Sequence, residues 1–234
     1  MRLFLIITTL AIALLSCQQK KEKATAVNAI QILLPDTNQY RNAQWDWKDR
    51  QYRAKLEKQL GLTDLLQGVD TLEVRLWYRS SFNSTEDLFT IKVYDTSYFL
   101  SYYKVYPRPY NFDNNSQDNR WDPMKDPKVD SVFSVTMQLN KKAFTQLHCD
   151  SLWLLKSQSE LPIADSIGFT DCDSYTLEIA DAKRFKYLQH HCTLEYYKRT
   201  GLKEIMDFDR GCNGIRQLAY ALHLYPFLFK EPGN

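Results

Sequence analysis

The chain has 234 residues, of which 44% are hydrophobic and 14% aromatic, with 30 Lys and Arg against 28 Asp and Glu. The near balance of charge provides no basic excess of the kind that nucleic-acid binding requires, so we expect no nucleic-acid partner. Seven glycines and eight prolines, beside that hydrophobic content, exclude a low-complexity or intrinsically disordered chain.

The first 16 residues have the features of a signal peptide. Arg2 supplies a positive charge, and the apolar stretch from Leu3 to Leu15 is too short for a typical membrane-spanning helix. The boundary Leu14-Leu15-Ser16-Cys17 resembles the lipobox of bacterial lipoprotein precursors, whose cysteine is acylated and becomes the mature N-terminus. The resemblance implies that Cys17 anchors the chain to a lipid bilayer in the cell envelope, on the periplasmic side or outer surface. An ordinary secretory signal with an incidental cysteine is the alternative.

Three segments follow from this boundary: a signal peptide over residues 1–16, a lipidated N-terminus and tether over 17–39, and one folded domain over 40–234. The first helix is predicted from Asp46 to Leu60. Its apolar face is marked by four residues at helical spacing, and Gly61 provides a natural stop. These four residues are Trp45, Tyr52, Leu56 and Leu60.

Alternating apolar and polar residues then predict a run of strands. Leu72 to Arg79 is the first, with Leu72, Val74, Leu76 and Tyr78 on one face. Leu88–Tyr94 and Tyr98–Tyr106 follow, and the three strands are expected to form an antiparallel meander. A long polar loop over about 107–128 leads to a fourth strand, Val129–Leu139.

The C-terminal half is predicted to contain a helix from Lys141 to about Leu155, a hairpin over 173–191 and a last helix from Asn213 to Leu224. Gly211-Cys-Asn-Gly214 is interpreted as the turn that enters this last helix. Because strands come in runs, the pattern favours an α+β fold with a mainly antiparallel sheet, a meander plus a later hairpin, and helices packed on one face. This layout resembles many small exported lipoproteins of unassigned function, and it implies no activity.

Four cysteines remain if Cys17 carries lipid, and an even number in an exported chain suggests disulfides, with three pairings open. In the hairpin, pairing Ala180 with Arg184 places Ile179 opposite Phe185 and Glu178 opposite Lys186. That register brings Cys172 opposite Cys192, so we favour this disulfide. The two remaining cysteines, Cys149 and Cys212, would then form the second disulfide.

Two segments invite a metal-site interpretation. The loop from Asp113 to Asn119 has oxygen ligands at alternate positions, as a calcium loop does, but Asp118 and Met124 stand where an EF-hand requires Gly and Glu. His190-His191-Cys192 would place His190 and Cys192 on one strand face, yet the closely spaced ligand pairs of structural zinc sites are missing. The sequence therefore predicts no metal and no other cofactor.

Aromatic residues crowd the third strand and the loop after it, and aromatic surfaces suit protein or glycan partners. We predict a contact surface there, with ordinary core packing as the alternative interpretation. Its residues are Tyr102, Tyr106, Tyr110 and Trp121.

Common nucleophile and nucleotide-binding motifs are missing from the sequence, so no catalytic residue is assigned. The preferred interpretation is a non-catalytic, membrane-anchored binding or interaction lipoprotein. An immunity-type lipoprotein that neutralises a toxin is a narrower form of it, and a hydrolase with a scattered active site is the alternative.

Overall fold

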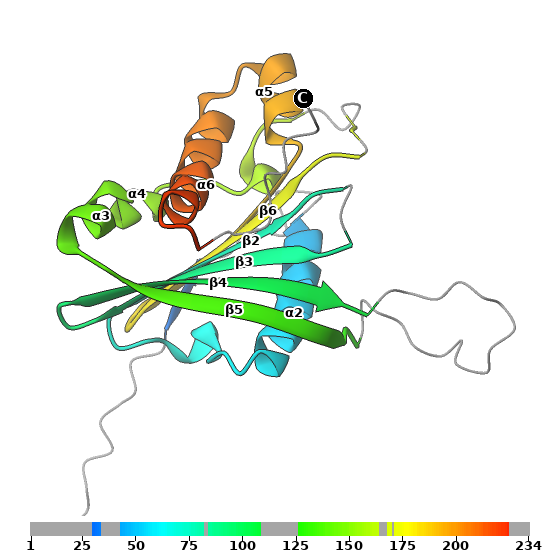
Figure 1. Cartoon of the computed structure of the whole chain (residues 1–234). Coiled ribbons are helices and arrows are strands. Elements are labelled where there is room, and N and C mark those ends of the chain that lie inside the picture. The colour runs from blue at the N-terminus through cyan, green and yellow to red at the C-terminus, as the bar shows by residue number, and fades with distance from the viewer. Residues whose placement is uncertain are drawn as a thin grey trace, which may run out of the picture.

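The computed structural model describes residues 30–33, 43–81, 84–108, 126–163, 168–169 and 171–224. A seven-stranded sheet forms the centre of the molecule, in the order β1-β7-β6-β2-β3-β4-β5 (Figure 1). Its strands are β1 (Gln31–Leu33), β2 (Leu72–Arg79), β3 (Glu86–Tyr94), β4 (Ser97–Pro107), β5 (Val129–Leu139), β6 (Ser174–Asp181) and β7 (Arg184–His191). Every neighbouring pair is antiparallel except β1 and β7, so the predicted α+β class with a mainly antiparallel sheet is confirmed.

The predicted meander is present as β2, β3 and β4, and β5 adds the fourth strand. β2 pairs on its other side with β6, which places the later hairpin beside the meander in one sheet. No helix within the described ranges has the length and apolar character needed to cross a membrane.

Helices cover both faces of the sheet, which corrects the expectation that they pack on one face (Figure 1). On one face, α2 (Ala43–Gln59) packs Leu56 against Trp77 and Leu88. On the other face, α6 (Lys203–Ala221) packs Phe208 and Ile215 into the larger apolar cluster of the sheet. Both faces of the sheet are covered because β2 has side chains to bury on each of them. One face of β2 is apolar, and the other has Trp77 together with buried charged side chains.

The first helix forms close to its predicted bounds, although one of the four residues predicted to lie in the core is exposed. Tyr52, Leu56 and Leu60 belong to the cluster around Trp77, whereas the side chain of Trp45 is 61% exposed. The segment expected to be a tether over 17–39 also contributes to the fold, because β1 pairs in parallel with β7 and Ile30 packs beside Phe185. The folded part of the chain therefore begins before residue 40.

The hairpin of β6 and β7 forms with a register one residue away from the predicted one. Ala180 lies opposite Phe185, and Glu178 lies opposite Tyr187 rather than Lys186. The chain reverses through residues 182–183 after Asp181, whose carboxylate accepts hydrogen bonds from the backbone N–H groups of Lys183 and Arg184. The predicted pairing of Ala180 with Arg184 would leave three residues in the turn, and the two-residue turn that forms instead accounts for the shift in register.

The disulfide between Cys172 and Cys192 is nevertheless present, with the two Cα atoms 5.2 Å apart. Both residues lie just outside the paired part of the hairpin, where Cys192 has a φ of 52° and leaves the strand geometry. The second expected disulfide is not formed, since Cys149 and Cys212 are buried free thiols. Each packs as a small apolar side chain in the cluster beneath α6, and burial raises the pKa of both thiols, that of Cys149 to about 12.

The helices of the C-terminal half differ most from expectation. The predicted helix from Lys141 to Leu155 is divided into α3 (Lys141–Gln146) and α4 (Cys149–Leu152), because His148 adopts a left-handed conformation with φ 47°. A further helix, α5 (Thr193–Thr200), was not predicted.

The last helix, α6, begins ten residues earlier than predicted, so the sequence Gly211-Cys-Asn-Gly214 lies inside a helix and does not form its entry turn. At Gly211 a Cβ atom would lie 2.9 Å from Cδ2 of Leu152. The glycine thus lets α6 approach α4 closely, and this contact offsets the low helix propensity of glycine.

Candidate functional site

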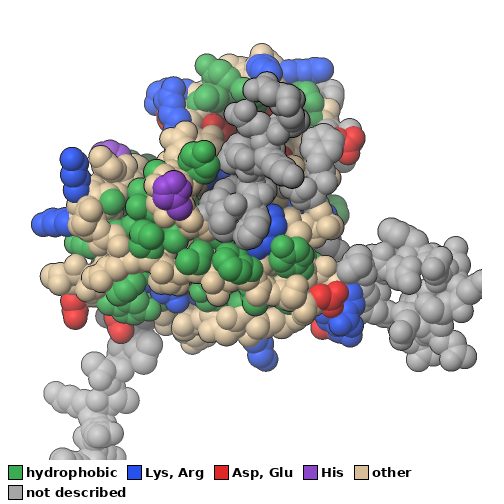
Figure 2. All heavy atoms as spheres, in the orientation of Figure 1, with side chains coloured by type: hydrophobic (Ala, Val, Ile, Leu, Met, Phe, Trp, Pro, Cys, Tyr) green, Lys and Arg blue, Asp and Glu red, His purple; other side chains and the backbone are tan. Residues whose placement is uncertain are grey.

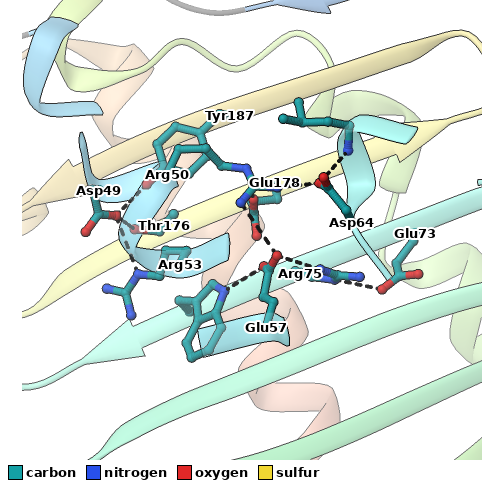
Figure 3. Close-up of polar contacts among 12 residues, drawn as sticks. Asp49, Arg50, Arg53, Glu57, Asp64, Glu73, Arg75, Thr176, Glu178 and Tyr187 are labelled. Carbon is teal, nitrogen blue, oxygen red and sulfur yellow. Dashed lines mark hydrogen bonds and ion pairs between the residues drawn. The ribbon is translucent and has the colours of Figure 1, made fainter. Parts of the chain in front are cut away.

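A layer of charged side chains lies between α2 and the sheet (Figure 3). It is hereafter called the charged layer. Arg50, Arg53 and Glu57 come from α2, where they share a face at spacings of three and four residues. The sheet supplies the facing groups, which are Glu73 and Arg75 from β2, Glu86 from β3, Thr176 and Glu178 from β6 and Tyr187 from β7.

The centre of the charged layer consists of Arg50, Glu57, Arg75 and Glu178, each at most 2% exposed. The guanidinium of Arg75 lies 2.8 Å from Glu57, and the Nε of Arg50 lies 2.8 Å from Glu178. Arg75 also donates to Glu73 at 2.7 Å and to the backbone carbonyl of Thr63 at 2.6 Å. These contacts compensate for the removal of two arginines from water.

The pKa values of two buried carboxyl groups, those of Glu178 and Glu57, are shifted in opposite directions. Burial, the negative charge of Glu57 and a hydrogen bond with Glu57 raise the pKa of Glu178 well above its usual value. For Glu57, burial acts in the same direction, but the hydrogen bond from Glu178 and the charges of Arg75 and Arg50 lower its pKa overall. Of these two carboxyl groups, Glu178 is therefore the one on which a proton is favoured.

A second group of contacts extends the charged layer along α2. Arg53 forms an ion pair with Glu86, and its guanidinium lies 4.9 Å from the ring of Trp77. Asp49 accepts hydrogen bonds from Tyr187 and, at 3.0 Å, from Thr176. These groups form ion pairs with one another, and the central ones are closed to solvent, so the charged layer fixes the position of α2 on the sheet. Several of its buried atoms, among them Nε of Arg50 and both carboxyl oxygens of Glu178, have no hydrogen-bond partner among the described residues.

At the N-terminal end of α2, the buried carboxylate of Asp46 accepts hydrogen bonds from Ser157 at 2.7 Å and Ser159 at 2.6 Å. Burial raises the pKa of Asp46 from 3.8 to about 6, against the opposing effect of these two hydrogen bonds. The contact joins α2 to η2 (Gln158–Glu160), which begins with a capping box between Ser157 and Glu160.

We expect this carboxylate to make stability depend on pH. Because folding raises the pKa of Asp46, the folded state binds the proton more tightly, and the associated stability is lost as the pH rises from about 4 through about 6. The difference in unfolding free energy between the wild type and Asp46→Asn should change by about 2 kcal/mol between pH 4 and pH 7. Urea unfolding of both proteins across this range measures it, and parallel pH profiles would contradict the prediction.

A cavity of about 380 Å³ lies beside the disulfide, between the end of β7 and α6. Both cysteines line it, together with four carboxylates, those of Asp171, Asp173, Glu195 and Asp209. Thr193 and Asn213 hold the carboxylate of Asp209 at 3.0 and 2.8 Å. Tyr78 donates to Asp173 at 2.8 Å, and burial raises the pKa of Tyr78 to about 12. The lining is acidic and disfavours anionic ligands.

A second cavity, of about 350 Å³, brings His148, Asp150 and Ser151 together beside Cys149. A hydrolase would require the serine hydroxyl to donate to the imidazole. Instead, the hydroxyl of Ser151 donates to the backbone carbonyl of His148 at 2.7 Å. The high pKa of Cys149 likewise leaves its thiol protonated at neutral pH. The arrangement therefore does not form a nucleophile with its base.

The predicted aromatic contact surface is only partly available. Tyr102 is 3% exposed, and its hydroxyl donates to Asp87 at 2.8 Å inside the core. This residue is therefore a packing residue, which corrects the prediction, because the α6 side of β4 builds the main apolar cluster. Tyr106 is exposed near the end of β4, whereas Tyr110 and Trp121 lie outside the described residues.

Next to Tyr106, the last strand of the sheet exposes an apolar surface. Strand β5 has eleven residues, of which Asp130 alone is charged, and it contains no proline. Hydrophobic side chains gather over the part of the sheet formed by β4 and β5 (Figure 2). We define the β5 edge surface as Tyr106, Val132, Phe133 and Met137, whose side chains are between 37% and 46% exposed.

The register explains how the β5 edge surface is formed. Phe133 lies opposite Lys104, and Met137 lies opposite Leu100, so both side chains project on the α6 side of the sheet. Val132 lies opposite Val105 and projects on the α2 side. The sequence pattern located the strand but suggested one buried face. Alternation of side chains does not show that β5 is an edge strand, so the exposure of both its faces could not be predicted.

In comparisons with known proteins, no family model matches the chain, and no curated protein reaches significant similarity to it. The functional conclusion therefore depends on the geometry described above.

Proposed function

We propose that this protein is a lipid-anchored lipoprotein of the bacterial cell envelope whose folded domain binds an extended segment of a partner polypeptide along β5. The observation that carries the proposal is the long, exposed edge strand, in which Asp130 is the single charged residue. A natural edge strand is normally protected by short length, charged side chains, proline or a covering element. The opposite edge of the sheet, β1, follows this rule with three residues.

An extended peptide suits this surface for two reasons. The outer edge of β5 offers a row of main-chain donors and acceptors, which a partner strand can pair by β-augmentation. The side chains of Phe133 and Met137 on one face, and of Val132 on the other, provide apolar contacts for alternate residues of such a strand. The exposed ion pair between Arg108 and Asp130, at 2.7 Å, limits the apolar surface at one end.

Charged substitutions on the β5 edge surface should abolish partner binding. We expect Phe133→Lys with Met137→Lys to reduce recovery of the bound partner from detergent-solubilised envelopes by at least tenfold, because two lysines would have to be desolvated in the paired strand. The measurement is affinity purification with quantitative mass spectrometry. Tyr94→Lys with Leu154→Lys is the matched control, since both side chains are also exposed. Unchanged recovery in the β5 variant, or recovery of a second copy of this chain alone, would refute the proposal.

Anchoring through Cys17 is proposed from the lipobox resemblance, and residues 1–29 lie outside the described part of the chain. Cys17→Ala is expected to abolish incorporation of an alkyne-labelled fatty acid and to release the protein from the membrane fraction. Labelling of the alanine variant would show that the chain is processed in another way. This test is independent of β5.

A further inference from the structure

We propose that Cys172, His191 and Cys192 form a zinc site that opens when a dithiol reduces the disulfide between the two cysteines. Within the described residues these three side chains form a group of metal-ligating atoms that all lie within 4.8 Å of one another. Two sulfurs and one imidazole are donors that Zn²⁺ prefers, and three protein ligands leave a fourth position for water. The site is separate from β5 and does not depend on the proposed function.

The conformation of Cys192 creates this grouping. In a regular strand, His190 and Cys192 would share a face. Because Cys192 instead has a φ of 52° and caps the N-terminus of α5, its sulfur lies beside His191, 3.3 Å from Nδ1 and 3.0 Å from Nε2. His190 points elsewhere, stacks on Phe208 and contacts the carbonyl of Lys156.

His191 has a backbone partner that sets its tautomer. Its Nε2 lies 3.1 Å from the backbone carbonyl of Phe169, and a carbonyl can only accept, so Nε2 carries the proton. Nδ1 is then the unprotonated ring nitrogen, and it lies 3.3 Å from the sulfur of Cys192. Zinc-bound histidines usually donate their other ring N–H to such an oxygen, which fixes the ring orientation and the tautomer.

The surroundings favour a cation over an anion. Both cysteines line the acidic cavity, where Asp171 and Asp173 flank Cys172 and raise the local concentration of cations. The cavity also provides a path for Zn²⁺ to reach the sulfurs.

The site forms in two steps, reduction of the disulfide and then binding of Zn²⁺. In the first step, a dithiol transfers two electrons and two protons to the Cys172–Cys192 bond, which breaks to give two thiols while the dithiol closes to its own disulfide. In the second step, Zn²⁺ displaces the two thiol protons, and the sulfurs separate to about 3.8 Å, the spacing of two thiolates in a tetrahedral zinc site. Oxidation of the thiols releases the metal by reversing the sequence.

The test is a titration of the whole folded chain with Co²⁺, then Zn²⁺, before and after reduction with a phosphine. We expect one Co²⁺ per reduced chain, with thiolate-to-cobalt absorption that Zn²⁺ abolishes, and no such signal from the oxidised chain. Cys172→Ser and His191→Ala should each weaken binding at least ~10- to 100-fold, the loss that accompanies even changes in the second shell. Cys149→Ala with Cys212→Ala, and separately His223→Ala, are controls that should retain binding.

Thermal unfolding provides the second readout. Zn²⁺ should raise the unfolding temperature of the reduced wild type and leave that of reduced His191→Ala unchanged. Binding to Cys172→Ser that is as tight as binding to the wild type, or a reduced wild type that binds no metal, whether folded or unfolded, would overturn the zinc site.

Discussion

A variant in which methionine replaces Arg75 should be about 3–5 kcal/mol less stable than the wild type, which is the cost of leaving a buried charge without its partner. Arg75 is fully buried and contacts Glu57, Glu73 and the carbonyl of Thr63. Without the guanidinium, Glu57 and Glu73 remain buried with less compensating charge. Urea unfolding at pH 7 measures the difference in the free energy of unfolding.

Two further variants define what the Arg75 result means. Arg108→Met removes an ion pair whose side chains are 53% and 40% exposed, and it should cost about 1 kcal/mol or less. Glu178→Gln should also cost about 1 kcal/mol or less, because the pKa of Glu178 is raised well above its usual value and a neutral amide of the same shape can replace the protonated carboxyl group. A loss below 1 kcal/mol for Arg75→Met, or a large loss for Glu178→Gln, would contradict this description of the charged layer.

Removal of the disulfide is the second large effect that we expect. Cys172 and Cys192 are 20 residues apart, and closing a loop of this size contributes about 3 kcal/mol in the chain-entropy model. Cys172→Ala with Cys192→Ala should therefore lower the free energy of unfolding by about 3 kcal/mol in metal-free buffer, measured by urea unfolding.

The response to reductant separates this effect from damage by the substitutions. A phosphine reductant should destabilise the wild type and Cys149→Ala with Cys212→Ala by similar amounts, because the latter two cysteines are free thiols. It should leave the Cys172/Cys192 double variant unchanged. A wild type that is indifferent to reductant would contradict the predicted stabilisation.

Elements with a clear local period could be predicted from the sequence. Strands β2 to β5 follow from alternating side chains, and α2 follows from apolar residues at helical spacing. The start of α6 could not be predicted in this way, because Gly211 and Gly214 indicate a turn. Only the close approach of Leu152, about 60 residues earlier in the chain, explains a glycine within this helix.

The charged layer could not be predicted, because it depends on which surfaces face each other. Glu73 and Arg75 alternate with apolar residues and therefore appear to form a solvent-facing side of β2. In the structure that side is covered by α2, which contributes Arg50 and Glu57. The local sequence pattern shows on which face of a strand a side chain lies, but it does not show which element packs against that face.

The cysteine pairing shows a related limit. The hairpin was predicted from its apolar residues, and Cys172–Cys192 was the favoured disulfide, yet the register on which that pairing was argued is wrong by one residue. The left-handed conformation at Cys192 brings the sulfurs together and places His191 beside them. Such backbone conformations at the end of a strand are set by tertiary packing.

Site-specific photocrosslinking in the native cell envelope tests the proposed use of β5 most directly. The photoreactive amino acid p-benzoylphenylalanine is introduced at Phe133 in one strain and at Tyr94, which is similarly exposed, in another. We predict a discrete crosslink from position 133 to an extended segment of one envelope protein, and none of that product from position 94. The same product from both positions, or none from position 133, would contradict the claim that β5 is the binding edge.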